Sequence, residues 1–339
     1  MEFLKNCWYV AAWDHEILSD TLLQRTICEE SIVFFRGNDN QPHALANRCC
    51  HRHAPLHMGR KEGDCVRCMY HGIKYDSQGR CVEIPGQEVI PEKIAQRSYP
   101  VVQRKRWVWI WMGDPSLADE TQIPDTFSMQ DPAWRWKPSY LHYNANYLNI
   151  ADNLLDFSHL SYVHEKTFGG SPNIAEAKPE VTRLERGIRV SRPVRNTVPA
   201  PYHQRLGQFS GKVNRWFEYD FLMPGVLLLD AGVRPVEDAE DDNTHALRFH
   251  SCQAITPETG GSTHYFFMQA HNFHTDDATV TESIEQSQRA AFLEDKAILE
   301  AQQRMIDPQV PMFNIVADKA LMQFRRLLDE AIKNESTPH

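Results

Sequence analysis

The sequence predicts an α+β protein of two domains, an all-β domain followed by a domain that mixes helices with strands. Two observations predict this class. Residues 1–118 consist of short β-type runs separated by turns, whereas 151–163 and 277–306 have helical periodicity. A chain of 339 residues is long enough for two domains that each bury a core. We therefore expect domains at 1–118 and 136–339, joined by a polar linker at 119–135.

Short apolar runs locate the strands. The segment 31–46 predicts a hairpin, because two β-type runs flank a turn-rich sequence, and 107–112 predicts a buried strand. In the second half, 216–222 and 263–270 alternate polar and apolar residues as half-buried strands do. The Pro-containing region 171–201 is expected to have irregular stretches.

Composition excludes several classes of function. The content of 42% hydrophobic and 24% charged residues is typical of a globular protein. The formal net charge of −9 argues against a nucleic-acid surface. No window approaches the roughly 18 apolar residues that span a membrane. The start lacks signal-peptide features, and 8 Cys in a chain of this size do not resemble a disulfide framework, so we expect a cytoplasmic location.

A cysteine–histidine motif predicts a metal site in the first domain. Cys49 and His51 form a Cys-x-His pair, and Cys68 and His71 form a Cys-x-x-His pair after 16 intervening residues. A Rieske [2Fe–2S] cluster needs two thiolates on one iron and two imidazoles on the other. A structural zinc site uses the same ligand types at similar spacing, so zinc remains the alternative.

Other donors compete for the first site. The competing residues are Cys50, His53, His57 and Cys65. Only the set of Cys49, His51, Cys68 and His71 provides both halves of the motif, so we predict these four as the cluster ligands.

The segment around 152–164 predicts half of a second metal site. Asn153, Asp156 and His159 are spaced by three residues and would share one face of a helix. His164 lies about 140° farther round an ideal helix, so both His could bind one metal only if the helix ends or distorts between them. Two partly buried His without a metal are the alternative.

A third ligand is expected on the later helix. Its apolar stripe is marked by Ala291, Phe292, Ile298 and Leu299. Asp295 falls within this stripe, where a carboxylate is costly unless it is paired or bound to metal. A buried salt bridge is the alternative for Asp295, and Glu294, about 100° away, is expected to face solvent. His159, His164 and Asp295 together would form a two-His, one-carboxylate triad, which suits a non-haem Fe(II) oxygenase.

With both motifs in place, the chain resembles the oxygenase components of Rieske non-haem iron monooxygenases, in the group of vanillate O-demethylase, toluenesulfonate methyl-monooxygenase and dicamba O-demethylase. The matching segments are Asn6-Cys-Trp-Tyr-Val, the cluster motif, Trp109-Ile-Trp-Met-Gly-Asp-Pro, Asp152-Asn-Leu-Leu-Asp-Phe-Ser-His and Leu293-Glu-Asp-Lys. Cys50 and Met69 depart from this pattern, because relatives often have Pro there.

The resemblance implies a fold, an assembly and two further site residues. The fold would be an N-terminal all-β Rieske [2Fe–2S] domain followed by a C-terminal helix-grip catalytic domain, an antiparallel sheet with helices. The assembly would be a head-to-tail homotrimer. Asp156 would then link the cluster ligand His71 of one subunit to the iron ligand His159 of its neighbour, and Asn153 would lie close to the iron.

The resemblance also implies the reaction and the partners. O2 would be the co-substrate, and a small methyl- or methoxy-substituted aromatic acid would be hydroxylated or demethylated. Electrons would come from NADH through a separate ferredoxin-type flavin reductase, since the chain has no Gly-rich dinucleotide fingerprint. The candidates for binding the acid are Arg195, Arg205, Arg215, Arg234 and Arg248.

The alternatives are of three kinds. A ring-hydroxylating Rieske dioxygenase would use the same two metal sites. A Rieske electron-transfer protein would use only the cluster. A zinc-stabilised ligand-binding protein would hold zinc at the Cys and His of the first motif and no iron.

Overall fold

The computed structural model describes residues 3–167, 173–240 and 242–336. The chain divides into two compact units. Unit 1 comprises residues 1–124 and 256–260, and unit 2 comprises residues 125–255 and 261–339. The expected domain bounds at 118 and 136 stay a prediction.

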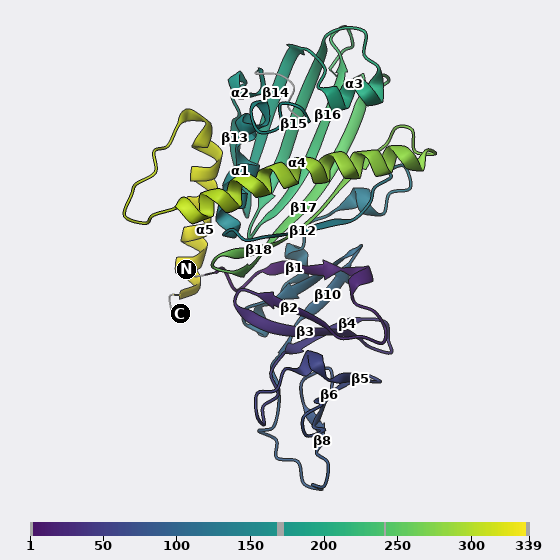
Figure 1. Ribbon diagram of the computed structural model, residues 1–339, viewed down its shortest axis with the longest axis vertical. Coiled ribbons are helices and arrows are strands. Elements are labelled where there is room, and N and C mark those ends of the chain that lie inside the picture. Colours follow the sequence, from purple (N-terminus) through teal and green to yellow (C-terminus); the bar gives the residue numbers. More distant parts are fainter. Residues whose placement is uncertain (1–2, 168–172, 241, 337–339) are drawn as a thin grey trace. The chain divides into compact units, whose positions relative to one another are not determined.

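Unit 1 is built from three antiparallel sheets with short 3-10 turns between strands (Figure 1). The first sheet has the order β1-β11-β10, the second β2-β3-β4-β9 and the third β5-β6-β7-β8. The strands are β1 (Trp8–Trp13), β2 (Leu23–Ile27), β3 (Glu30–Arg36), β4 (Pro42–Ala46), β5 (Arg60–Glu62), β6 (Cys65–Arg67), β7 (Lys74–Tyr75), β8 (Cys81–Glu83), β9 (Ser98–Tyr99), β10 (Val101–Arg104) and β11 (Trp107–Trp111). The turns are η1 (Asp14–Glu16), η2 (Leu56–Met58), η3 (Pro115–Leu117) and η4 (Glu120–Gln122).

Two strand predictions for unit 1 are confirmed. β3 pairs with β4 as the expected hairpin. Every residue of β11 is buried, and the rings of Trp8 and Trp111 meet edge to face at 5.5 Å. Aromatic pairs of this geometry add about 0.5–1.5 kcal/mol beyond the burial of their area.

Unit 2 is a seven-stranded antiparallel sheet covered by helices. Its strand order is β12-β18-β17-β16-β15-β14-β13. The strands are β12 (Ser139–Tyr143), β13 (Glu180–Leu184), β14 (Gly187–Thr197), β15 (Val213–Leu222), β16 (Val226–Pro235), β17 (Leu247–Thr259) and β18 (Ser262–His271). The helices and turns are η5 (Phe127–Met129), α1 (Tyr147–Leu155), η6 (Phe157–Ser161), α2 (Asn173–Glu176), α3 (Pro201–Gly207), α4 (Ala278–Met305), η7 (Val316–Asp318) and α5 (Lys319–Ser336).

Helix α4 lies across one face of this sheet (Figure 1). The helix predicted at 277–306 is confirmed by α4, which spans Ala278–Met305. It begins there because the Asp277 side chain caps it by accepting from the backbone N–H of Thr279. Its buried stripe contains Ala291, Phe292, Asp295 and Leu299 as expected. Ile298 is 50% exposed, so placing it in that stripe was wrong.

One of two expectations for the second half is corrected. Instead of a helix over 151–163, α1 ends at Leu155 and η6 begins at Phe157, because Asp156 adopts an extended conformation (φ −120°, ψ 93°) between them. The region 171–201 has irregular stretches as expected, at 177–179 and 198–200, and it also contains α2, β13 and β14. Ser171 and Pro172 lie outside the described residues.

No helix in the described part of the chain is both long enough and apolar enough to cross a membrane.

Candidate functional site: two metal-binding regions and a cavity

The Cys and His of the first motif lie on two loops of unit 1. Both loops are closed by the same pattern of backbone hydrogen bonds. In the first loop, Cys49 N donates to Ala54 O (2.8 Å) and His53 N donates to Cys49 O (2.9 Å). In the second, Cys68 N donates to Ile73 O (2.8 Å) and Gly72 N donates to Cys68 O (3.0 Å). His53 and Gly72 both have positive φ, 59° and 74°, which the turn requires and which Gly adopts without strain.

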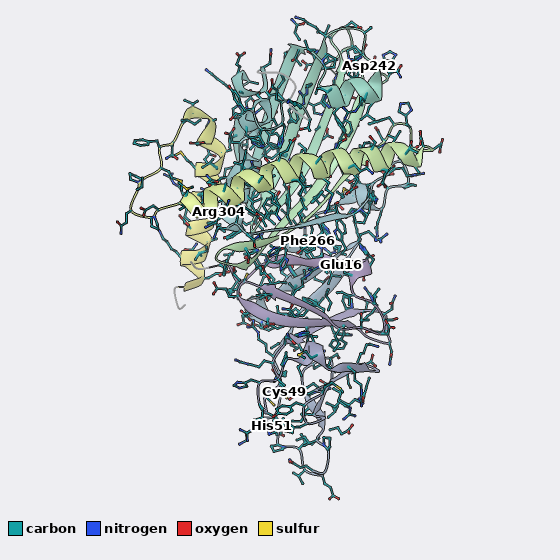
Figure 2. All side chains as sticks on the ribbon, viewed as in Figure 1. Glu16, Cys49, His51, Asp242, Phe266 and Arg304 are labelled. Atoms are coloured by element: carbon teal, nitrogen blue, oxygen red, sulfur yellow. The ribbon has the colours of Figure 1, made fainter. Side chains whose placement is uncertain are left out.

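The four residues form an inner pair and an outer pair. Cys49 and Cys68 are 2% and 1% exposed and belong to the buried core of this region. The Tyr75 hydroxyl lies 3.2 Å from Cys49 Sγ. His51 and His71 are exposed, and their ring centroids are 4.5 Å apart. Figure 2 labels Cys49 and His51 at the end of unit 1 that carries β5, β6 and β8.

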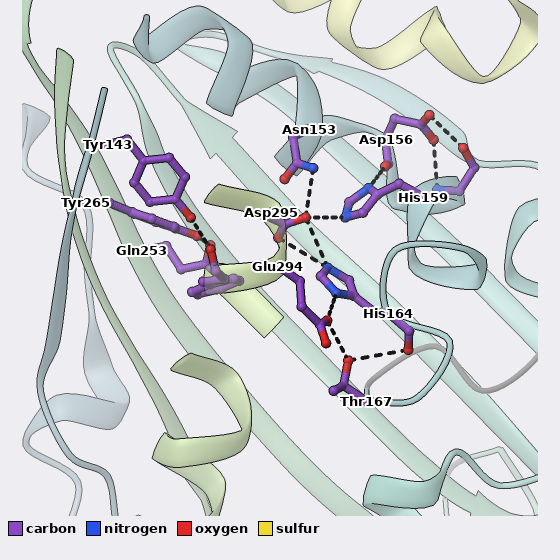
Figure 3. Close-up of polar contacts among 12 residues, drawn as sticks. Tyr143, Asn153, Asp156, His159, His164, Thr167, Gln253, Tyr265, Glu294 and Asp295 are labelled. Carbon is purple, nitrogen blue, oxygen red and sulfur yellow. Dashed lines mark hydrogen bonds and ion pairs between the residues drawn. The ribbon is translucent and has the colours of Figure 1, made fainter. Parts of the chain in front are cut away.

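The second group of donors lies in unit 2 and comes from distant parts of the sequence. Among the described residues, His159, His164 and Asp295 are the set of His, Cys, Asp or Glu side chains whose donor atoms all lie within 4.8 Å of one another. Both His Nε2 atoms face Asp295 Oδ1, at 3.5 Å from His159 and 3.2 Å from His164 (Figure 3). Ligands at right angles on one ion would be roughly 3 Å apart, so small movements suffice for all three to bind one metal.

The other ring nitrogen of each His is held by an acceptor. His159 Nδ1 donates to the backbone carbonyl of Asp156 (2.5 Å), and His164 Nδ1 contacts Glu294 Oε2 at 2.7 Å. A neutral ring whose Nδ1 carries the proton presents a lone pair at Nε2. Both lone pairs then face the Asp295 carboxylate, and a cation between the three groups would satisfy them all. This second hydrogen bond is typical of metal-binding His.

The two His differ in their ionisation. Burial lowers the pKa of His159. Burial also opposes protonation of His164, but its hydrogen bonds to Asp295 and Glu294 outweigh that effect and raise its pKa.

Asn153 and Asp156 lie beside this group in different ways. Asn153 Nδ2 donates to Asp295 Oδ1 (3.2 Å). The Asp156 carboxylate accepts from Ser158 N (2.9 Å) and Ser158 Oγ (2.7 Å) and so caps η6. Since α1 ends before Asp156, the three residues do not share one helical face as expected, although Asn153 and His159 still reach the same carboxylate.

Glu294 is a site residue that sequence reasoning placed wrongly. It was expected to face solvent, but its side chain is 37% exposed and contacts both His164 Nδ1 and Thr167 Oγ1 (3.0 Å). The signal in the sequence was its position next to Asp295. The two adjacent side chains reach opposite nitrogens of the same imidazole.

A cavity opens beside the second group. It is lined by His159, His164 and Asp295 together with aromatic side chains such as Phe157, Phe217 and Phe292. A mostly apolar cavity with a few polar groups at one end suits a small organic ligand.

Comparison with known proteins finds two family domains, one in each half of the chain. Residues 7–100 match the Rieske [2Fe-2S] domain, and residues 143–334 match the vanillate O-demethylase oxygenase C-terminal domain. The iron-sulfur subunit of a toluene-4-sulfonate monooxygenase system from Comamonas testosteroni is 45% identical over 98% of both chains. The oxygenase component of dicamba O-demethylase from Stenotrophomonas maltophilia is 34% identical over 90% of this chain and 89% of its own.

Solved structures agree with these matches and confirm the predicted fold class. Dicamba monooxygenase bound to 3,6-dichlorosalicylic acid has a TM-score of 0.94 at 30% identity and covers 100% of both chains. Dicamba monooxygenase with non-heme iron and dicamba has a TM-score of 0.86 at 29% identity and covers 99% of both. This chain therefore belongs to the Rieske non-haem iron oxygenases, as an oxygenase component of the monooxygenase type in the group that includes the vanillate and dicamba O-demethylases.

Proposed function

We propose that this chain uses O2 to hydroxylate a methyl group, or to remove a methoxy methyl group, of a small aromatic acid. The observation that carries the proposal is the convergence of His159, His164 and Asp295 on a mostly apolar cavity, in a chain that also has a Rieske domain. The relatives named for toluene-4-sulfonate, dicamba and vanillate support this substrate class. Electrons come from NADH through a separate ferredoxin-type flavin reductase.

The proposed cluster ligands are Cys49 and Cys68 on one iron and His51 and His71 on the other. Their division into a buried Cys pair and an exposed His pair supports two irons rather than one zinc. One tetrahedral zinc would hold its ligands within roughly 4 Å of one another. Among the described residues, however, the group with donor atoms within 4.8 Å of one another is His159, His164 and Asp295, and the four Cys and His of the motif do not form such a group.

The proposed ligands of the mononuclear iron are His159, His164 and Asp295. When bound there, ferrous iron supplies open coordination positions for O2, and the cluster supplies electrons one at a time. The protein does the positioning. Glu294 and the Asp156 carbonyl keep the protons of the two rings on Nδ1, and Asn153 orients the Asp295 carboxylate. Phe157, Phe217 and Phe292 exclude water and pack against the aromatic ring.

We further propose a cytoplasmic homotrimer in which Asp156 lies between His159 of one subunit and His71 of the next. The exposure of His51 and His71 supports this, because imidazoles on the surface can meet a second copy of the chain. Asp156 is partly exposed, with 18% of its side chain accessible. The eight free cysteines fit a reducing compartment.

Asp156→Asn tests the proposed link between subunits. The variant should keep both metal sites and the trimer mass, while turnover falls at least about a hundredfold. Asp220→Asn is the matched control, since Asp220 forms an ion pair with Arg189 away from the cavity and its replacement should leave turnover unchanged. Activity of Asp156→Asn equal to that of the unaltered protein would exclude this link.

Oxygen uptake tests the reaction itself. The purified protein, a flavin reductase and NADH are supplied with methyl- and methoxy-substituted benzoates and benzenesulfonates, and O2 use, benzylic alcohol and formaldehyde are measured. We expect one alcohol or one formaldehyde for each O2. A cis-dihydrodiol product would instead identify a ring dioxygenase. Absence of O2 use with every acid, together with electron delivery to an external acceptor, would identify an electron carrier.

A further inference from the structure

One of the five candidate arginines lines the same cavity as the metal-binding group. Arg215 on β15 is 3% exposed and faces the cavity together with His159 and Asp295. Its guanidinium lies over the Phe217 ring at 5.1 Å and brings a positive charge to the cavity wall. A carboxylate or sulfonate in the cavity can form charge-assisted hydrogen bonds with such a group. Burial lowers the pKa of Arg215 to about 10, and the side chain is still cationic at neutral pH.

The other four arginines do not line the cavity. Arg195 is exposed and pairs with Glu240, and Arg205 is exposed on α3. Arg234 stacks on the Trp216 ring at 4.5 Å. Arg248 pairs with Asp230 at 2.8 Å. Asp230 is adjacent to Leu229 and Ala231, which line the cavity, and adjacent residues of a strand point to opposite faces, so Arg248 lies on the outer face of the sheet.

His203 gives a second, independent reason to expect a polar ligand at this end. It is 6% exposed and lines the same cavity, and its Nδ1 has no hydrogen-bond partner among the described residues. A buried nitrogen without a partner costs free energy that a bound ligand would recover. Burial and the nearby Arg215 charge lower the pKa of His203 well below its usual value, so the ring is neutral and can donate from Nδ1.

The order of residues along β15 places this charge away from the metal-binding group. Tyr219 donates to the carbonyl of Leu155 at the end of α1, next to the segment that carries His159. Phe217 follows on the same face and packs against Phe157 at 5.7 Å. Arg215 is one more step along that face, about 7 Å farther. Aromatic side chains therefore lie between the cationic end of the cavity and the metal-binding end.

We propose that Arg215 and His203 form an anion-binding subsite that holds the oxyanion of an aromatic acid. The ring lies against Phe217, and its meta or para methyl or methoxy carbon reaches His159, His164 and Asp295. The subsite rests on the proposed function for its reaction but makes a separate claim about binding. Sulfonate and carboxylate share the chemistry that Arg215 recognises, and the experiment compares them.

Binding without turnover tests the subsite. Calorimetry on the oxidised holoenzyme, without reductase, compares 4-methylbenzenesulfonate with the uncharged 4-methylbenzenesulfonamide, and 4-methylbenzoate with 4-methylbenzamide. The unaltered protein should prefer each anion roughly 10- to 100-fold. Arg215→Met should lose this preference and Arg215→Lys should keep part of it. Arg248→Met removes the same charge from the outer face of the sheet and should bind as the unaltered protein does.

Each outcome decides something. An Arg215→Met protein that still prefers the anions would overturn the subsite. Equal binding of acid and amide by the unaltered protein would overturn it as well, and this comparison holds even if the variant does not fold. Selective binding of the acids with no oxidation of any of them would contradict the proposed function alone. The stronger of the two acids identifies which oxyanion the subsite fits.

Discussion

The two candidate metal-binding regions are built in opposite ways. Cys49, His51, Cys68 and His71 lie on two short loops, each closed by its own backbone hydrogen bonds, and both His are exposed. The second region joins residues 131 positions apart, His164 and Asp295, both of which are buried. Local backbone geometry defines the first region. Packing of α4 on the sheet and on α1 defines the second, so its geometry exists only when unit 2 is folded.

The largest expected effect tests whether the two regions bind metal independently. His164→Ala should abolish oxygenation and remove about one of three irons per chain, while the visible absorption of the cluster persists. Cys68→Ser is the mirror variant and should lose the cluster absorption. Iron content and the visible spectrum measure both results. Loss of the cluster spectrum from His164→Ala would mean that the regions are not independent.

A smaller effect tests the support behind the buried region. Glu294→Gln removes the charge that holds His164 Nδ1, and loss of such a contact typically weakens metal affinity 10- to 100-fold. Titration of the metal-free protein with Fe(II) measures the affinity. Glu300→Gln is the control on the same helix, because Glu300 contacts Lys296 and Asn144 instead. If both variants bind Fe(II) equally well, Glu294 has no such role.

The smallest effect concerns the outer face of the sheet, away from both regions. Burial opposes ionisation of Asp230, but hydrogen bonds from His250, Trp216 and Arg248 outweigh it and lower the pKa to about 2. A lowered pKa stabilises the fold above the unfolded pKa, near 3.8, and this contribution is lost as the pH falls toward 2. Asp230→Asn should therefore cost about 1 kcal/mol at pH 7, after allowance for solvent screening, and less at pH 3. Urea unfolding at both pH values measures this difference, and a cost that grows on acidification would contradict it.

The same contrast explains what the sequence alone could predict. The four Cys and His could be predicted as ligands because their spacing is local, and this assignment stays a prediction. The helix that carries Asp295 was predicted correctly because its apolar period is strong. The end of α1 at Leu155 was not predicted. The side chain of Asp156 caps η6 and so ends α1, and the periodicity of apolar residues does not reveal such a cap. Glu294 was wrongly predicted to face solvent, because its angle on the helix does not reveal that His164 from a distant segment contacts it.

The sequence alone also could not show which arginine lines the cavity. Five arginines were equal candidates in the sequence, and only strand pairing separates them. Arg215 and Arg248 are on nearby strands of one sheet, yet they point to opposite faces. Which face is covered by α4 depends on long-range contacts that no local pattern encodes.

The uninterrupted course of α4 makes the second region sensitive to chain length. One residue inserted just before Glu294 would rotate all later residues of α4 by about 100° about the helix axis and shift them by about 1.5 Å along it. Glu294 would then occupy the place of Asp295, and His164 would lose the partner of its Nδ1. The cluster loops can differ in the spacing of their own His, two residues after Cys49 and three after Cys68, and still close in the same way. Insertions and deletions should therefore be excluded from residues 288–295 of related chains far more strictly than substitutions are.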